Sequence, residues 1–174
     1  ELIIIKEHLD QEISKNFKYR LYHTNFNRET LGIKHKFESS GLKDSIDNDF
    51  QTFYERVSSS RLVIISYRPG TTATEVLSAN IPSMHFCPLE SGELNENAKE
   101  SYEALEKVGV FHNNIESLAL KINEVYFNID DWWFSNKVQE AVSCFCQNYA
   151  FTNNKFIDSW VEELQSQINL KSSR

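Results

Sequence analysis

An unbroken apolar run, residues 62–65, is followed by a turn at residues 69–70 and then by a helical pattern of apolar positions. A continuous apolar run of this length is typical of a strand whose sheet is covered by helices on both faces. Pro82 cannot continue the helix that follows, so the helix ends at residues 80–82. Residues 83–87 then have the apolar character of the next buried strand. The pattern therefore predicts a strand, a loop, a helix and a second strand.

Upstream of this stretch, helical and extended patterns alternate. Residues 2–17 carry apolar side chains on one helical stripe, which predicts a single helix. Residues 19–23 alternate in character and predict a short strand. Arg20 and His23 would stand at its carboxyl end, where open α/β sheets bind their ligands. The alternative is a solvated arginine and a surface histidine.

Two further helices are predicted before the apolar run. Residues 28–37 are helical in pattern, and residues 41–48 have the composition of a loop. Residues 49–58 place their aromatic and aliphatic side chains on one helical face, with Asp47 or Asn48 as the cap.

The pattern after residue 88 is almost entirely helical. A connection at residues 89–94 leads to a helix over residues 95–108, which ends at Gly109. Residues 110–112 form a short extended piece, and Asn114 starts the next helix.

Two more helices complete the predicted order. Asp130 and Asp131 are expected to cap a helix that begins with Trp132. A final helix over residues 153–168 is expected to turn one apolar face inward, and residues 171–174 are a polar tail. The inward side chains expected in the final helix are Phe156, Ile157, Trp160, Leu164 and Ile168.

Because strands alternate with helices as far as Cys87 and helices cover the rest, the predicted fold class is α/β. We expect a small Rossmann-like parallel sheet flanked by helices, with a helical C-terminal region. Residues 1–112 would form the sheet-containing core, and residues 113–174 a helical wrap of the same domain.

Composition and charge narrow the function classes. The 174 residues suit one domain, and the hydrophobic fraction of 40% with 25% charged residues argues against disorder. The net charge of −7 argues against a broad surface that binds nucleic acid. An anionic ligand would therefore have to be bound by local hydrogen-bond donors and not by the overall charge. No apolar run approaches the roughly 18 residues of a membrane span.

The three cysteines, Cys87, Cys144 and Cys146, are odd in number and lack metal-ligand spacing. Cys144 and Cys146 would point to different faces of a helix, which favours structural thiols in a reducing compartment over a redox pair. The chain begins without Met inside an element, so we expect it to be a fragment of a longer protein.

The turn at residues 69–70 has the chemistry of an anion site. Gly70 permits unusual dihedral angles and a close approach of the backbone to a ligand. Thr71 or Thr72 can cap the following helix, whose first N–H groups and dipole favour an anion. The alternative is that many α/β crossovers have a glycine turn and a capping threonine without binding anything.

The run PGTTATEVLSANIP resembles the donor-binding turn of GT-B glycosyltransferases, in which a Gly-Gly/Thr-x-x-Glu pattern opens a helix that ends in a small residue and Pro. The segments SRLVIISY, AKESYEALEKVGVFHN and DDWWFSNKVQEAVSCFC are also similar to a family of transferases found with bacterial O-antigen and surface-polysaccharide biosynthesis. The resemblance covers roughly residues 20–149, and its Trp-Trp and Val-Gln segment is the most specific part.

The resemblance implies the C-terminal, donor-binding half of a two-domain glycosyltransferase. Glu75 matches the glutamate that accepts hydrogen bonds from ribose hydroxyls, and a carboxylate suits two vicinal hydroxyls. Gly70, Thr71 and Thr72 match the positions that hold the phosphate of the donor. Arg68 could add a charge-assisted contact to that phosphate, or form a salt bridge within the loop.

The resemblance also has a departure and leaves the catalytic base open. Many GT-B members have a His or a second Gly ahead of the turn, where this chain has residues 67–69, Tyr-Arg-Pro. This leaves a nucleoside diphosphate sugar and a CMP-linked acidic sugar both open as donors. The titratable side chains near predicted strand ends are His23, His85, Glu90 and Glu93. The pair Trp132 and Trp133 could stack on a base or a sugar, or anchor the core.

The partners implied by the resemblance are a nucleotide sugar, a glycan or lipid-linked acceptor, and the missing N-terminal half, with no cofactor and no metal. It implies a cytoplasmic protein, with association of the full-length form at the inner face of the bacterial inner membrane as a further expectation. The second hypothesis is a non-catalytic module that binds a nucleotide or uses its helical region to bind another protein.

Overall fold

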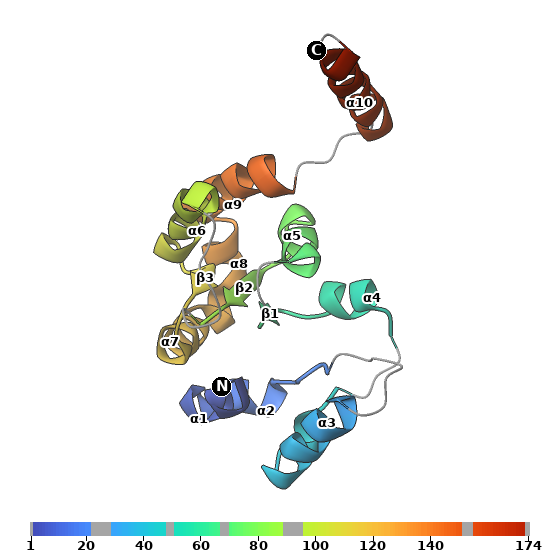
Figure 1. The fold of residues 1–174 in the computed structure, drawn as a ribbon. Coiled ribbons are helices and arrows are strands. Elements are labelled where there is room, and N and C mark those ends of the chain that lie inside the picture. Colours follow the sequence, from blue (N-terminus) through green and yellow to red (C-terminus); the bar gives the residue numbers. More distant parts are fainter. Residues whose placement is uncertain are drawn as a thin grey trace.

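The computed structural model describes residues 2–21, 29–47, 51–66, 70–88, 96–150 and 155–172. Within these residues, one sheet contains three parallel strands in the order β1 (Val63–Ile65), β2 (Ser83–Phe86) and β3 (Phe111–His112) (Figure 1). The register pairs Ile64 with Met84 and His85 with Phe111. The strands predicted at residues 62–65, 83–87 and 110–112 are therefore confirmed, each slightly shortened.

Helices surround this short sheet (Figure 1). In chain order they are α1 (Ile5–His8), α2 (Gln11–Asn16), α3 (Glu29–Ser39), α4 (Phe53–Ser58), α5 (Thr71–Ser78), α6 (Glu96–Lys107), α7 (Ile115–Val125), α8 (Ile129–Trp133), α9 (Asn136–Tyr149) and α10 (Phe156–Ser172). Short 3-10 turns precede α1 at η1 (Leu2–Ile4), precede α4 at η2 (Lys43–Ser45) and join α7 to α8 at η4 (Tyr126–Asn128).

One face of the sheet is covered by α1, α2 and α7. Met84 and Phe86 are two residues apart on β2, so their side chains point to the same face of the sheet. Both belong to a core cluster with side chains of these helices. Figure 1 shows α7 and α1 on the same side of the strands. The residues that α1, α2, α7 and the break at Leu9 contribute to this cluster are Ile5, Leu9 and Ile13 with Ile115, Leu118, Ala119, Ile122 and Val125.

The other face is covered by α5, α6, α8 and α9. Phe111 of β3 belongs to a second core cluster whose largest fully buried member is Trp133. The helical residues of this cluster are Leu77, Tyr102, Leu105, Trp133, Val138, Val142 and Phe145. Helices thus cover both faces of a small parallel sheet, which confirms the α/β class and the helical C-terminal region. The division at residue 112 stays a prediction.

Three helices end in the same backbone motif, with a residue of positive φ just beyond the helix. These residues are Gly41 after α3, Asn80 after α5 and Gly109 after α6, with φ angles of 73°, 53° and 76°. After α5, the Ile81 amide donates to the Val76 carbonyl and the Asn80 amide to the Leu77 carbonyl, at 3.2 and 3.0 Å. This pair of bonds satisfies the last carbonyls of the helix. The predicted ends at Asn80 and Gly109 are confirmed.

The single helix predicted over residues 2–17 is wrong. Leu9 is extended, with φ −90° and ψ 145°, and separates α1 from α2. Asn123 of α7 enters the break, because its side chain accepts from the Asp10 amide at 3.0 Å and donates to the His8 carbonyl at 3.0 Å. The side chain of a distant residue therefore replaces bonds that a continuous helix would make.

The cap predicted for α4 is also wrong. Thr52, and not Asp47 or Asn48, is the N-cap, and its side chain exchanges hydrogen bonds with Glu55 in a capping box. Residue 48 lies outside the described residues. The helix begins at Phe53, four residues later than the pattern predicts.

The strand predicted over residues 19–23 is reduced to one bridge. Tyr19 pairs in parallel with Ile46 outside the main sheet, and Leu21 has no strand geometry. Residues 22–28 lie outside the described part of the chain.

The helical C-terminal region differs from the prediction in two places. Asp130 and Asp131 lie inside the first turn of α8 and do not cap it, and a second helix, α9, starts after Ser135. The final helix α10 is present, but its apolar side chains are exposed and not inward, with Trp160 at 65% exposure. Figure 1 shows α10 standing apart from the helices that cover the sheet.

None of the helices in the described part of the chain has both the length and the apolar character required to cross a bilayer.

Candidate functional site

The carboxyl ends of the three parallel strands lie at one edge of the sheet, and α5 begins at this edge. β1 ends at Ile65, and after the loop the chain enters α5 at Thr71 with Gly70 as its N-cap. Open α/β sheets bind ligands outside the carboxyl ends of their strands, where helix N-termini also point. The start of α5 is therefore the first place to look for a ligand site.

Gly70 differs from expectation in its backbone conformation. Its φ of −141° and ψ of −171° are extended, so the position does not require the freedom of a glycine. What glycine provides here is the absence of a side chain over the start of α5. Gly70 therefore cannot cap the first N–H groups of α5 with a side chain of its own.

Neither threonine caps α5. Thr71 and Thr72 are the first two helical residues, and in the described structure no side chain accepts a hydrogen bond from the first turn. The Gly70 carbonyl accepts from the Ala73 and Thr74 amides at 3.0 and 3.2 Å. The earlier N–H groups have no acceptor inside the helix, and the helix dipole adds partial positive charge there. The helix start can thus receive an anion.

Glu75 lies one turn further along α5. It is exposed, whereas Ala73, Val76 and Leu77 are buried and fix the other face of the helix. Residues four apart share a helix face, so Glu75 follows Thr71 at about 6 Å along the axis. This distance separates a phosphate-binding helix start from a carboxylate that can accept from hydroxyl groups.

Four other predicted candidates lie outside the described residues. They are Arg68, His23, Glu90 and Glu93. The structure brings Gly70, Thr71, Thr72 and Glu75 together on one helix and leaves those four unplaced.

His85 lies on β2, close to the carboxyl end of the strand, but it is too buried to act as an accessible base. The side chain is 6% exposed, and its Nε2 lies 3.3 Å from the Ser83 hydroxyl on the same strand. Burial lowers the pKa of the His85 imidazole from 6.5 to about 4. A buried, neutral imidazole of this kind packs within the sheet and cannot contact a bound substrate.

His112, at the end of β3, is a second buried histidine, which the pattern of the chain does not single out. Its Nε2 lies 3.0 Å from the Gly109 carbonyl, which can only accept, and its Nδ1 lies 3.1 Å from the Ser117 hydroxyl. Burial lowers the pKa of His112, the Gly109 bond opposes this shift, and the charge of Lys121 adds to it. His112 thus ties β3 to the start of α7.

Arg20 takes part in an ion cluster around a buried carboxylate. Arg56 donates to Asp47 from Nε at 2.9 Å and from a terminal nitrogen at 3.3 Å. Arg20 lies 3.6 Å from the same carboxylate and donates to the Gln51 carbonyl. The Asp47 side chain is 6% exposed, while both arginines are about a third exposed. Arg20 is therefore neither simply solvated nor positioned by a full strand.

The Trp-Trp and Val-Gln segment, which is the most specific part of the family resemblance, packs in the core and connects helices. Trp133 is fully buried and donates from Nε1 to the carbonyl and the side-chain oxygen of Asn80, at 3.1 and 3.0 Å. Gln139 donates to the same side-chain oxygen at 3.1 Å and to the Trp133 carbonyl at 2.8 Å. These bonds fasten the C-terminal end of α5 to α8 and α9.

Trp132 is partly buried and donates to the Val108 carbonyl at 3.0 Å. The Lys121 ammonium lies 5.8 Å from its ring centre. Trp133 is fully enclosed, so the alternative of a core anchor is confirmed for Trp133. Trp132 packs against both core clusters but is only partly buried, and its stacking on a ligand stays a prediction.

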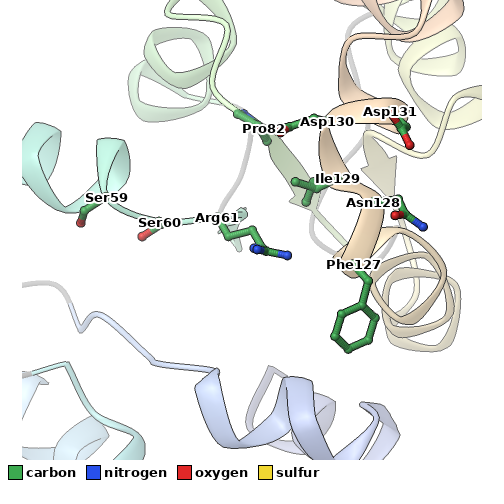
Figure 2. A pocket seen from close by; sticks show the side chains of 9 residues that line it. All are labelled: Ser59, Ser60, Arg61, Pro82, Phe127, Asn128, Ile129, Asp130 and Asp131. Atoms are coloured by element: carbon green, nitrogen blue, oxygen red, sulfur yellow. The ribbon is translucent and has the colours of Figure 1, made fainter.

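A cavity of about 560 Å³ lies elsewhere, between the end of α4 and the segment that joins α7 to α8. Figure 2 shows Arg61 reaching from the start of β1 toward that segment. The guanidinium donates to the Tyr126 carbonyl at 3.1 Å. The lining residues are Ser59, Ser60, Arg61, Pro82, Phe127, Asn128, Ile129, Asp130 and Asp131.

This cavity is at the amino edge of the sheet. Arg61 precedes β1, and Pro82 directly precedes β2, so both lie opposite to the start of α5. Ligands of open α/β sheets bind at the carboxyl edge. The cavity is lined by one guanidinium, that of Arg61, and by two carboxylates, those of Asp130 and Asp131. The two negative charges disfavour the binding of an anion there. The start of α5 is the better candidate site.

Among the described residues, no group of three or more His, Cys, Asp or Glu is arranged to hold a metal ion. In the part of the chain that the structure describes, Cys87, Cys144 and Cys146 form no disulfide with one another, and burial raises the pKa of the Cys146 thiol.

A protein-family model described as LIC12162 family transferase matches residues 6–164 of the chain. The matched range contains the whole sheet, α5 and the segment with Trp132 and Trp133. No curated protein and no solved structure gives a match.

Proposed function

Since the chain belongs to the LIC12162 family of transferases, we propose that it is the donor-binding half of a glycosyltransferase with the GT-B architecture. It would bind a nucleotide-activated sugar for transfer to a surface-polysaccharide acceptor. The acceptor would be a glycan or a lipid-linked glycan, bound with the help of an N-terminal half outside this chain.

The observation that carries this proposal is the open start of α5 at the carboxyl edge of a parallel sheet. Gly70 leaves the first turn without a side-chain cap, and the turn follows directly from the loop after β1. Uncapped N–H groups and the helix dipole together suit phosphate oxygens. The exposed Glu75 lies one turn away, on the side where the ribose of the same ligand would extend.

The proposed roles follow the chemistry of each group. The backbone at Gly70, Thr71 and Thr72 binds the phosphate of the donor, and the Glu75 carboxylate accepts from two ribose hydroxyls. Arg68, in the preceding loop, adds a charge-assisted contact to the phosphate. No cofactor and no metal take part in this scheme, because the helix start itself stabilises the leaving phosphate.

Transfer also needs a general base. The base removes the proton of an acceptor hydroxyl as its oxygen attacks the anomeric carbon and the bond to the phosphate breaks. The buried His85 cannot do this. We assign the base to the N-terminal half, with which this chain would form the active site at the cytoplasmic face of the bacterial inner membrane.

A nucleotide titration tests the proposal. We expect one class of UDP-, GDP-, TDP- or CMP-sugar to raise the melting temperature and to bind saturably. Replacing the carboxylate in Glu75→Ala should weaken that binding by about tenfold or more, since charged hydrogen bonds are lost. Glu103→Ala is the matched control, because Glu103 is an exposed glutamate within α6.

The titration also separates the proposal from a non-catalytic protein-interaction module. If no nucleotide or nucleotide sugar changes the melting temperature of this chain, or of a longer protein that contains it, the donor site does not exist. Equal binding by the wild type and Glu75→Ala would place the ligand elsewhere.

A further inference from the structure

The helix α10 exposes an apolar seam that the α/β core does not cover. Ile157, Val161, Leu164 and Ile168 are 62%, 46%, 55% and 63% exposed. All described side chains of α10 are exposed, and Figure 1 shows the helix apart from the sheet and its covering helices. Contiguous exposed apolar side chains of this kind usually mark an interaction surface.

The spacing of the seam is that of a coiled coil. Steps of four, three and four residues join Ile157, Val161, Leu164 and Ile168, which is the alternation of a and d positions in a heptad. With this register, the β-branched Val161 and Ile168 fall at a positions, and Ile157 and Leu164 fall at d positions. β-branched residues at a with leucine at d favour two parallel strands.

The residues that flank the seam are compatible with a second copy of the same helix. The g positions are Trp160 and Gln167, and the e positions include Asp158 and Gln165. Across a parallel pair, Trp160 of one copy would meet Gln165 of the other, so no like charges oppose each other there. Self-association is thus possible despite the net charge of −7.

A membrane surface is a poorer fit to α10. Helices that lie on membranes carry lysine and arginine on the polar face and are attracted to anionic lipids. The polar face of α10 instead carries Asp158, Glu162 and Glu163. These carboxylates would be repelled by an anionic bilayer.

A lone helix of this length also needs a packing partner. Most helical stability in proteins comes from packing an apolar face against a partner and not from helix propensity alone. α10 has 17 residues, and its apolar face is exposed. We propose that two copies of this chain associate through a parallel pair of α10 helices, with Ile157, Val161, Leu164 and Ile168 buried between them.

Sedimentation velocity of the 174-residue chain over a concentration series tests this proposal. We expect a monomer–dimer equilibrium that Leu164→Gln weakens by about tenfold or more, since a buried leucine is lost from the seam. Leu120→Gln is the matched control, because Leu120 is also an exposed helical leucine, at 72%, but lies on α7. That variant should dimerise like the wild type.

Three results would overturn the proposal. The first is a chain that stays monomeric at every concentration at which it remains in solution. The second is a dimer that Leu164→Gln and Leu120→Gln affect equally. The third is co-sedimentation with phosphatidylglycerol–phosphatidylcholine vesicles that Leu164→Gln abolishes, which would assign the seam to a lipid surface. Unchanged melting temperatures would show that both variants remain folded.

Discussion

Asn80 links the α5 segment to the tryptophan segment at the scale of a single residue. Its backbone takes φ 53°, and its side-chain oxygen accepts from Trp133 and from Gln139. Asparagine tolerates the left-handed region better than other residues with a Cβ, and it also offers an acceptor. The position therefore combines a backbone requirement with a side-chain requirement.

Two substitutions separate these requirements. Asn80→Gly keeps the backbone conformation and removes the shared acceptor, so the free energy of unfolding should fall by about 1 kcal/mol. Asn80→Ala also loses the tolerance that asparagine has for the left-handed region, which should cost about 1 kcal/mol more. Urea denaturation at neutral pH gives both values. A glycine variant as stable as the wild type would show that the bonds to Trp133 and Gln139 contribute nothing.

His85 gives the fold a dependence on pH. The pKa of His85 is lowered by burial from 6.5 to about 4, so between these values the unfolded chain binds a proton that the folded chain does not. Stability is therefore lost as the pH falls through this window, by up to about 3 kcal/mol, and His85 has no such effect above it.

The comparison of wild type with His85→Gln measures this contribution. Chemical denaturation between pH 7 and pH 4 should show a steeper loss of stability in the wild type, because glutamine does not titrate. Other groups titrate in both proteins and cancel in the difference. Equal slopes would mean that His85 is not buried as a neutral group.

Single residues also show the limit of sequence analysis. The placement of Gly70, Thr71, Thr72 and Glu75 at the start of one helix could be predicted, because it depends on a local strand-to-helix transition. The pairing of Asp47 with Arg20 and Arg56 could not, since it joins three segments that only the folded chain brings together. A helix cap was the better local expectation for Asp47, and tertiary contacts replaced it.

At the scale of elements, the start of α5 is open at some cost in stability. Gly70 is a weaker N-cap than aspartate or asparagine, which would accept a hydrogen bond from the first turn. The extended backbone of Gly70 can carry such a side chain. A helix start that has no side-chain cap from its N-cap residue and lies at the carboxyl edge of the sheet is consistent with the binding of an anion.

A trade between stability and affinity follows. Gly70→Asp should raise the free energy of unfolding by about 0.5 kcal/mol, through the cap and the helix dipole. It should weaken nucleotide binding by about tenfold or more, because the carboxylate occupies the N–H groups and repels phosphate. Thermal unfolding and calorimetric titration of one preparation measure both effects.

Gly70→Asn is the control for charge. It supplies a cap without a negative charge, so its affinity should lie between those of the wild type and Gly70→Asp. An aspartate variant that binds nucleotide as tightly as the wild type would exclude the start of α5 as the phosphate site.

Element boundaries were predicted well where local chemistry sets them. Gly109 ends α6, and Asn114 caps α7 by accepting from the Ser117 amide at 2.8 Å. The break between α1 and α2 escaped prediction because Asn123, more than a hundred residues away, stabilises it. The split between α8 and α9 has a local signal in Ser135, whose hydroxyl donates to the Trp132 carbonyl.

At the scale of the whole molecule, the parallel sheet separates two distinct surfaces. Its carboxyl edge holds the open start of α5, and its amino edge holds the cavity around Arg61. The α/β class was predictable because the apolar runs and helical stripes alternate. The exposure of α10 was not, because an apolar stripe has the same sequence whether it faces its own core or a second chain.

The central claim is that the phosphate of a nucleotide sugar binds the backbone at the start of α5. The most direct measurement is the change in backbone amide chemical shifts of the 15N-labelled chain during titration with a nucleotide sugar. We expect the largest shifts at Gly70, Thr71 and Thr72, saturating with the binding curve, and small shifts at Ser60 and Arg61. Shifts centred on Ser60 and Arg61, or no saturable shifts at all, would contradict the account.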